Sequence, residues 1–173
     1  MTLKIREMEI DDIPATFAVR LSAVENAVTM AELERDYGVT PHSLSEAMKS
    51  HVKGWVCEDA ASIVGFAMGD RSNGEVLVVA VRPEYERKGI GKSLLIHVQE
   101  WLFSEQHDEI WLLANPDPHI RATGFYRKLG WQATGTFMGN NEVLKLGKGK
   151  NPIANTPTDW AATISTPASE QDQ

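Results

Sequence analysis

The chain has 173 residues, the length of one domain, with 42% hydrophobic and 24% charged residues. These values are near the globular average and argue against a disordered or fibrous protein. No apolar run approaches the roughly 20 residues that cross a bilayer, and the N-terminal residues are charged where a signal peptide would be apolar. We therefore expect a soluble cytoplasmic protein that has no membrane partner.

The formal net charge is −7, which argues against nucleic acid as the main partner and is compatible with a cationic substrate. The single cysteine, Cys57, cannot form an internal disulfide, and its alternating segment predicts a small buried filler. The five histidines show neither an HExxH motif nor a tight cluster with cysteine. No metal site is predicted.

The N-terminal part begins with an alternating segment, 3–8, which predicts a strand. Asp11 or Asp12 then offers a helix cap, with Pro14 in the first turn. Apolar residues at intervals of three and four predict one amphipathic helix that includes Phe17, Leu21, Val24 and Val28. A second helical pattern covers about 43–51.

The rest of the chain alternates between apolar runs and turn residues. They predict a hairpin of strands at 55–58 and 63–68, single strands at 75–81 and 109–114, and helices at 90–102 and 120–129. A closing hairpin is predicted at 131–138 and 142–146. This order indicates an α/β (α+β) fold: one mixed, mostly antiparallel central sheet of about seven strands, with helices on both faces. We assign 1–147 to this domain and 148–173, poor in large apolar residues, to a flexible tail.

The segment from Val78 to Leu95 carries the most chemical information. A buried strand leads through a short loop into a helix, whose unpaired N–H groups and positive dipole end favour an anionic phosphate. Gly89 and Gly91 have no Cβ, so a diphosphate could approach the backbone closely, beside basic residues at 87, 88 and 92. Two glycines alone could equally serve a tight turn.

Three phosphate-binding motifs compete for this loop. A Walker A motif requires glycine where Glu86 stands, and a dinucleotide-binding fingerprint requires a third glycine after Gly91. The loop resembles the coenzyme A loop of the GNAT superfamily of N-acetyltransferases: Val81 and Pro83 match its V-x-P strand end, and Gly89 and Gly91 match its [QR]-x-x-G-x-[GA] pattern. Glu86 departs from the usual Gln or Arg.

A second block resembles the family's N-x-x-A-x-x-[FL]-Y-x-x-x-G-[FW] segment. The matching residues are Ala122, Phe125, Tyr126, Gly130 and Trp131, whereas His119 replaces the usual Asn. The resemblance covers about 5–146. It implies an N-acetyltransferase whose co-substrate is acetyl-CoA and whose fourth and fifth strands splay apart in a V.

The resemblance also implies residue roles. The backbone of Val79, Ala80 and Val81 would pair with the pantetheine arm. The pyrophosphate would be held by Arg87, Lys88, Gly89, Ile90, Gly91 and Lys92, and His119 would contact the cofactor. Tyr126 would be the general acid for the departing thiolate, although an FY pair is also typical of a helix core. Glu75 is the first candidate for the general base, with His119, a water-relayed base, or no base as alternatives.

The predicted function is the transfer of an acetyl group from acetyl-CoA to a primary amine of a small molecule, protein or peptide by direct attack. The alternatives are a catalytically weak coenzyme A-binding or amine-sensing module on the same fold, and a P-loop nucleotidase suggested by the GKS sequence. The resemblance also implies that the acceptor site is built from 23–50 and 134–141, and homodimerisation is compatible with it.

Overall fold

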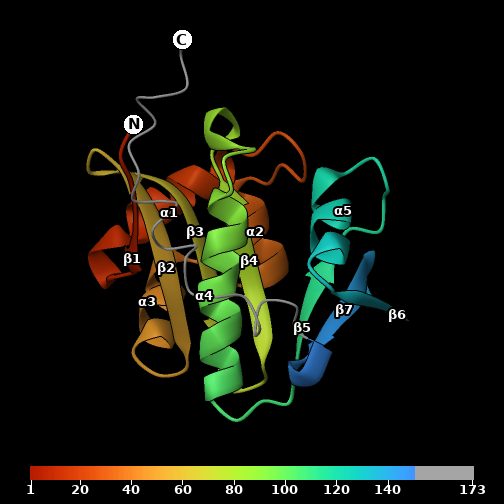
Figure 1. Cartoon of the computed structure of the whole chain (residues 1–173). Coiled ribbons are helices and arrows are strands. Elements are labelled where there is room, and N and C mark those ends of the chain that lie inside the picture. The colour runs from red at the N-terminus through yellow and green to blue at the C-terminus, as the bar shows by residue number, and fades with distance from the viewer. Residues whose placement is uncertain (151–173) are drawn as a thin grey trace.

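The computed structural model describes residues 1–150, and the fold below refers to that part of the chain (Figure 1). Seven strands form one sheet in the order β1-β2-β3-β4-β5-β7-β6. The strands are β1 (Leu3–Glu7), β2 (Val52–Asp59), β3 (Ser62–Asp70), β4 (Glu75–Val81), β5 (Glu109–Ala114), β6 (Gln132–Met138) and β7 (Asn141–Gly147). The predicted mixed, mostly antiparallel sheet is confirmed.

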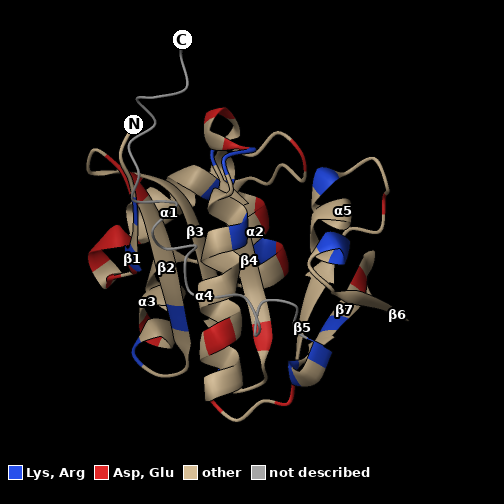
Figure 2. Cartoon of the chain, viewed as in Figure 1, with Lys and Arg blue, Asp and Glu red and all other residues tan. Residues whose placement is uncertain are grey.

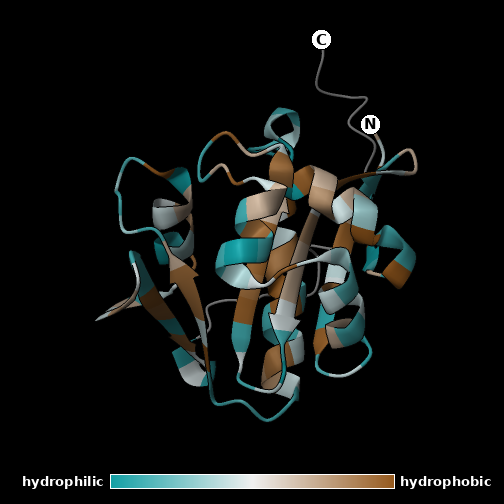
Figure 3. Cartoon of the chain, turned by 180° about the vertical axis from the view of Figure 1, so that it is seen from behind, coloured by the Kyte–Doolittle hydropathy of each residue, from teal (hydrophilic) through white to brown (hydrophobic). Residues whose placement is uncertain are grey.

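Helices cover both faces of the sheet. They are α1 (Ile13–Leu21), α2 (Met30–Tyr37), α3 (Pro41–Met48), α4 (Ile90–Ser104) and α5 (Arg121–Lys128), with short 3-10 turns at Ile10–Asp12, Pro83–Tyr85 and Lys148–Lys150. On one face α4 packs across the central strands; on the other, α1 contacts β3 and β4 and α3 contacts β2 (Figures 1 and 3). None of the described helices is long and apolar enough to cross a membrane.

Two apolar cores result, one on each face of the sheet. The α4 face is built around fully buried side chains such as Leu94, Leu102 and Ile110, and the α1 face around Val19 and Val56 (Figure 3). Cys57 belongs to the α4 core and is fully buried, as its alternating segment predicted. Burial raises the pKa of its thiol to about 11, so it is not a nucleophile at neutral pH.

The pairing of β4 with β5 is parallel and very short. Glu75 opposite Trp111 is their single registered pair, supported by the Trp111 N–H, which donates to the carbonyl of Gly74 at 3.1 Å. Beyond this point the two strands diverge toward their C-terminal ends, and the predicted V-shaped splay is confirmed (Figure 1). In β4 the register shifts between Val76 and Val78, which leaves Leu77 as a bulged residue that is 41% exposed.

The single N-terminal helix predicted from the sequence extended too far along the chain. It ends at Leu21, and Val24 is 80% exposed, so the apolar spacing of Val24 and Val28 does not continue the helix. A separate helix, α2, follows. Thr29 caps α2 through a reciprocal capping box with Glu32, and a left-handed glycine at position 38 (φ 65°) ends it.

The predicted boundary at 147 coincides with the end of β7 at Gly147, and a 3-10 turn follows at Lys148–Lys150. The remainder of the predicted tail, 151–173, lies outside the described residues, so the division into domain and flexible tail stays a prediction.

Candidate active site

A cavity of about 1570 Å³ opens where β4 and β5 diverge. Its walls come from β4, the start of α4, α5, the α1–α2 segment and the turn at 139–141. It therefore joins the two segments that carry the sequence motifs, which are separated by one helix and one strand in the chain. Of the predicted site residues, Glu75, Val79, Ala80, Val81, Arg87, Gly89, Ile90, Gly91, Lys92 and Tyr126 all line this cavity.

The start of α4 presents free backbone donors to the cavity. Gly89 is the N-cap in a left-handed conformation (φ 79°) and supplies no side-chain cap. In the described part of the chain nothing accepts a hydrogen bond from the backbone N–H groups of Ile90, Gly91 and Lys92. These donors and the positive end of a 15-residue helix form a site for an anion.

Open space lies in front of these donors. A Cβ added at Gly89 would meet nothing within 4 Å, and one added at Gly91 would lie 3.7 Å from both Phe125 Cζ and Val81 Cγ2. Lys and Arg residues lie in the loop ahead of α4 and along α5, and several of them line the cavity (Figure 2). Open space, free donors and positive charge therefore suit a diphosphate.

The edge of β4 that faces β5 is unpaired beyond Glu75. Val79, Ala80 and Val81 form this edge and line the cavity, while their other edge pairs with β3. An unpaired strand edge offers backbone donors and acceptors to an extended ligand that carries amide groups. The arrangement fits a pantetheine arm lying between the two strands.

Tyr126 projects from α5 into the same cavity. Its ring contacts Phe125 (centroids 5.1 Å apart) and Trp131 (6.2 Å), which hold its orientation. Burial raises the pKa of Tyr126 to about 12, so the phenol is protonated at neutral pH. Its hydroxyl makes no hydrogen bond with the residues that the structure describes, which leaves it free to donate to a ligand.

Glu75 lies at the closed end of the β4–β5 gap, where the strands still pair. Burial raises the pKa of its carboxyl, a hydrogen bond from Asn73 Nδ2 (3.4 Å) lowers it, and the negative charge of Asp70 raises it further. The net direction is upward. A carboxylate with a raised pKa is a stronger base than an ordinary surface glutamate.

Two predicted residues do not reach the cavity. The side chains of Lys88 and His119 are exposed and are not among its lining residues, whereas Pro118 and Ile120 on either side of His119 are. The backbone N–H of His119 donates to Asp117 at 2.9 Å, so this residue takes part in the turn ahead of α5. Their roles in cofactor binding stay predictions that the geometry does not support.

Glu86, the residue that departs from the family pattern, forms an ion pair that the sequence did not predict. Its carboxylate lies 2.7 Å from the guanidinium of Arg121, the first residue of α5. Both residues line the cavity, and the ion pair neutralises part of the negative charge that Glu86 brings close to the start of α4.

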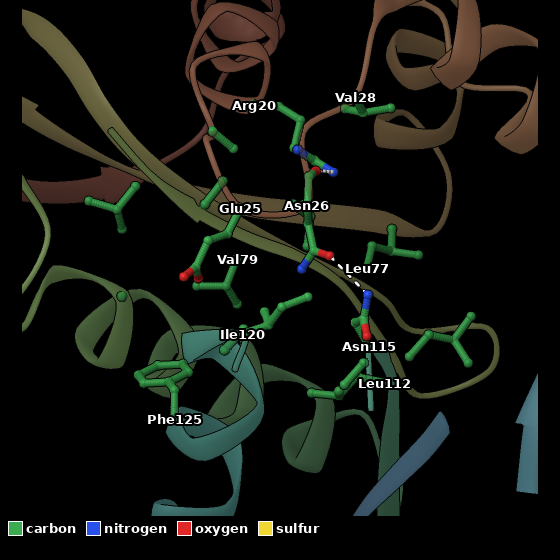
Figure 4. A pocket seen from close by; sticks show the side chains of 18 of the residues that line it. Arg20, Glu25, Asn26, Val28, Leu77, Val79, Leu112, Asn115, Ile120 and Phe125 are labelled. Atoms are coloured by element: carbon green, nitrogen blue, oxygen red, sulfur yellow. Dashed lines mark hydrogen bonds between the residues drawn. The ribbon is translucent and has the colours of Figure 1, made fainter. Parts of the chain in front are cut away.

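Sequence reasoning also missed how the loop between α1 and α2, residues 22–29, reaches across the cavity. Glu25 accepts a hydrogen bond from the backbone N–H of Arg121 (3.1 Å). Asn26 accepts one from Asn115 Nδ2 (3.3 Å), as Figure 4 shows. Arg20, near the end of α1, donates to the carbonyl of Asn26 at 3.0 Å. These partners are up to 96 residues apart, and no local sequence pattern announces them.

Comparison with known proteins is consistent with this geometry. The model of the acetyltransferase (GNAT) family matches residues 20–131. Among solved structures, the PaiA N-acetyltransferase from Thermoplasma acidophilum in complex with coenzyme A is 18% identical, with a TM-score of 0.70 over 85% of this chain and 99% of that chain. The ribosomal-protein-S18-alanine N-acetyltransferase from Escherichia coli is 18% identical, with a TM-score of 0.63 over 84% and 93%. At these identities the likeness shows the fold.

Proposed function

Because the chain belongs to the acetyltransferase (GNAT) family, we propose that it is an N-acetyltransferase that transfers an acetyl group from acetyl-CoA to a primary amine of a small molecule, protein or peptide. We further propose that it acts in the cytoplasm, as a monomer or homodimer. The observation that supports the enzyme most directly is a single cavity that combines an unpaired β4 edge, free N–H groups on α4 and the hydroxyl of Tyr126.

The chain's own groups would hold acetyl-CoA at two places. The N–H groups from Gly89 to Lys92 donate to the pyrophosphate, and Arg87 adds a positive charge. The free edge of Val79–Val81 pairs with the pantetheine amides. The bound co-substrate supplies an activated thioester, and its position in the gap brings that end toward Tyr126.

The reaction forms one bond and breaks one. The acceptor nitrogen bonds to the acetyl carbon, the carbon–sulfur bond breaks, and the products are an amide and the free thiol. The nitrogen loses one proton to a base, and the departing sulfur receives one from the hydroxyl of Tyr126. Its raised pKa of about 12 keeps that proton in place until negative charge develops on the sulfur.

Glu75 is the candidate base, because its raised pKa suits proton acceptance and it lines the same cavity. It stands at the closed end of the gap, so one or more waters would relay the proton from the acceptor. The exposed position of His119 makes it a poorer candidate. An acceptor amine that arrives neutral needs no base beyond water.

A second candidate function is a module that binds coenzyme A without efficient transfer. The replacement of the usual Gln or Arg by Glu86, and its ion pair with Arg121, favour this reading, because both change the phosphate site. Calorimetric titration with acetyl-CoA, followed by a thiol-release assay over a broad amine panel, separates the two. Absence of binding by the folded protein overturns both, whereas binding without transfer leaves only the second.

The Tyr126→Phe variant tests the mechanism. We expect kcat to fall about 10²- to 10⁴-fold, the usual contribution of a positioned general acid. The acetyl-CoA Kd and the melting temperature should stay unchanged, because the ring contacts with Phe125 and Trp131 are retained and no hydrogen bond to a described residue is lost. Wild-type turnover by this variant would remove Tyr126 from the mechanism.

A further inference from the structure

The side chain of Arg20 lines the cavity from α1, on the wall opposite α5. It is partly buried, and its one hydrogen bond within residues 1–150 is that from Nη2 to the carbonyl of Asn26. A guanidinium has five N–H donors, so most of its donors have no protein acceptor there. Figure 4 shows the side chain beside Asn26, which in turn faces Asn115.

This lack of a carboxylate partner distinguishes Arg20 from most arginines of the described chain. Ion pairs with Asp or Glu are formed by Arg6, Arg35, Arg71, Arg121 and Arg127. Of the arginines without such a pair, Arg20 and Arg87 both line the cavity. Arg87 stands at the expected pyrophosphate site, and Arg20 stands on the acceptor side.

The position of Arg20 is unfavourable for a lone charge. Burial lowers the pKa of its guanidinium, and the neighbouring Tyr37 offsets this only in part. No Asp or Glu within residues 1–150 forms an ion pair with it. Such a group gains most from an anion that enters the cavity with its own charge, since a paired and hydrogen-bonded guanidinium recovers the lost solvation.

The location of Arg20 also suits a substrate group. Asn26 links it to Asn115, which directly follows β5, the strand whose divergence from β4 opens the gap. Arg20 therefore lies beside that opening, next to the α1–α2 loop, which belongs to the expected acceptor region. Carboxylates of Glu25 and Glu75 line the same cavity and suit an ammonium group, while they disfavour a dianion such as a phosphate ester.

We propose that Arg20 binds a carboxylate of the acceptor, so that the substrates of this enzyme are small amines that also carry a carboxylate, such as free amino acids. This inference rests on the proposed acetyl transfer and specifies its acceptor. A planar guanidinium matches a carboxylate with two parallel hydrogen bonds, which fixes the orientation of the amine as well as its affinity.

The competing interpretation is that Arg20 only holds the α1–α2 loop through Asn26. The two interpretations differ in one respect. Loss of a loop contact weakens the reaction of every acceptor alike, whereas loss of a carboxylate partner weakens only acceptors that have a carboxylate.

The first experiment uses the wild-type protein and matched acceptor pairs. Free L-amino acids, β-alanine and 4-aminobutanoate are each compared with the corresponding carboxamide, and kcat/KM is measured by thiol release from acetyl-CoA. We expect the acid to exceed its amide by at least about tenfold for the accepted compounds, as one charge-assisted hydrogen-bonded pair supplies. Spermidine and a short peptide with an amidated C-terminus are included as acceptors without a carboxylate.

The second experiment repeats the measurement with Arg20→Gln and Arg20→Lys. Arg20→Gln should lower kcat/KM for the acid at least about tenfold, mainly through KM, and leave the amide within about twofold, whereas Arg20→Lys should recover part of the loss. The control is Arg71→Gln, which removes the same charge from an ion pair with Glu105 outside the cavity lining and should change neither.

Each outcome decides between the interpretations. Equal rates for acids and amides, a preference for spermidine or the amidated peptide, or no turnover with any acid overturns the inference, even where acetyl-CoA binds. An equal loss for acid and amide in Arg20→Gln assigns the residue to the loop alone. Failure to bind acetyl-CoA in calorimetry is a failure of the proposed function and is recognised separately.

Discussion

Replacing Gly89 with alanine tests whether the start of α4 binds the pyrophosphate. Gly89 has φ 79°, and a Cβ there would meet no protein atom within 4 Å. The substitution therefore introduces left-handed strain without a steric clash inside the protein. The new methyl group would enter the open space in front of the free N–H groups, where the diphosphate is expected.

The two effects have different magnitudes. A left-handed alanine costs about 1–2 kcal/mol, and the reduced freedom of the unfolded chain returns about half of that. A net loss of about 1 kcal/mol lowers the melting temperature by about 2–4 °C for a domain of this size. Displacing the diphosphate from one or two charged hydrogen bonds, each worth about 1.5–3 kcal/mol, should weaken acetyl-CoA binding at least tenfold.

Gly135 provides a matched control. It also has a positive φ, 74°, and a Cβ there would likewise meet nothing within 4 Å, but it lies in β6 and does not line the cavity. Both alanine variants should lose similar thermal stability, measured by scanning fluorimetry. Only Gly89→Ala should raise the acetyl-CoA Kd, measured by calorimetry, and an unchanged Kd in Gly89→Ala, or equal weakening in both variants, would refute the assignment of the phosphate site.

Three further predictions concern the charges and backbone around the site. Glu86→Gln should tighten acetyl-CoA binding about two- to tenfold, less so in 0.5 M salt, because a negative charge beside the phosphates is removed; the lost ion pair with Arg121 is exposed, so the melting temperature should fall by less than about 3 °C. A weaker complex would contradict this. The pKa of Glu75 is raised in the folded protein, so its stability contribution is present below the unfolded pKa of about 4.5 and is lost as pH rises through the folded pKa. Glu75→Gln should therefore melt higher than wild type at pH 7 and equally at pH 4, and a pH-independent difference would count against the raised pKa. The hairpin turn between β2 and β3 places Ala60 (φ 48°) and Ala61 (φ 68°) in left-handed conformations, so Asn-Gly at these positions should add about 1–2 kcal/mol to the free energy of unfolding without changing kcat, as denaturant titration and turnover assays would show.

Much of the sheet could be predicted from the sequence because its strands are bounded by local signals. The apolar runs at Glu75–Val81 and Glu109–Ala114 match the bounds of the observed β4 and β5. The strand β4 is less buried than predicted: Val76 is its one buried residue, because the strand lines the cavity. Gly130 likewise predicted the end of α5, and it adopts a left-handed φ of 92° just after the helix.

The missed helix, α2, shows where apolar periodicity fails. The helix has the sequence MAELERDY, and Leu33 is its single buried residue, so it has too few apolar residues for a periodic pattern to be recognised. The end signals were nevertheless present. Thr29 and Glu32 form the capping box, and Gly38 ends the helix. Helix-capping signals would therefore have located α2 if they had been considered before apolar periodicity.

The candidate site divides in the same way. The proposed phosphate site uses backbone N–H groups of one continuous loop and helix, and the glycines that permit this are visible as a local motif. The proposed acceptor wall uses side chains whose contacts depend on the whole fold. Nothing around Arg20 in the sequence indicates that its partner is Asn26, or that Asn26 will meet Asn115, 89 residues later in the chain.

Arg121 joins these two parts of the cavity. Its backbone N–H donates to Glu25 on the acceptor wall, and its guanidinium pairs with Glu86 on the cofactor loop. Both contacts are made by the first residue of α5, five positions before the candidate acid Tyr126. A displacement of α5 would therefore alter both contacts at once, because the same residue makes them.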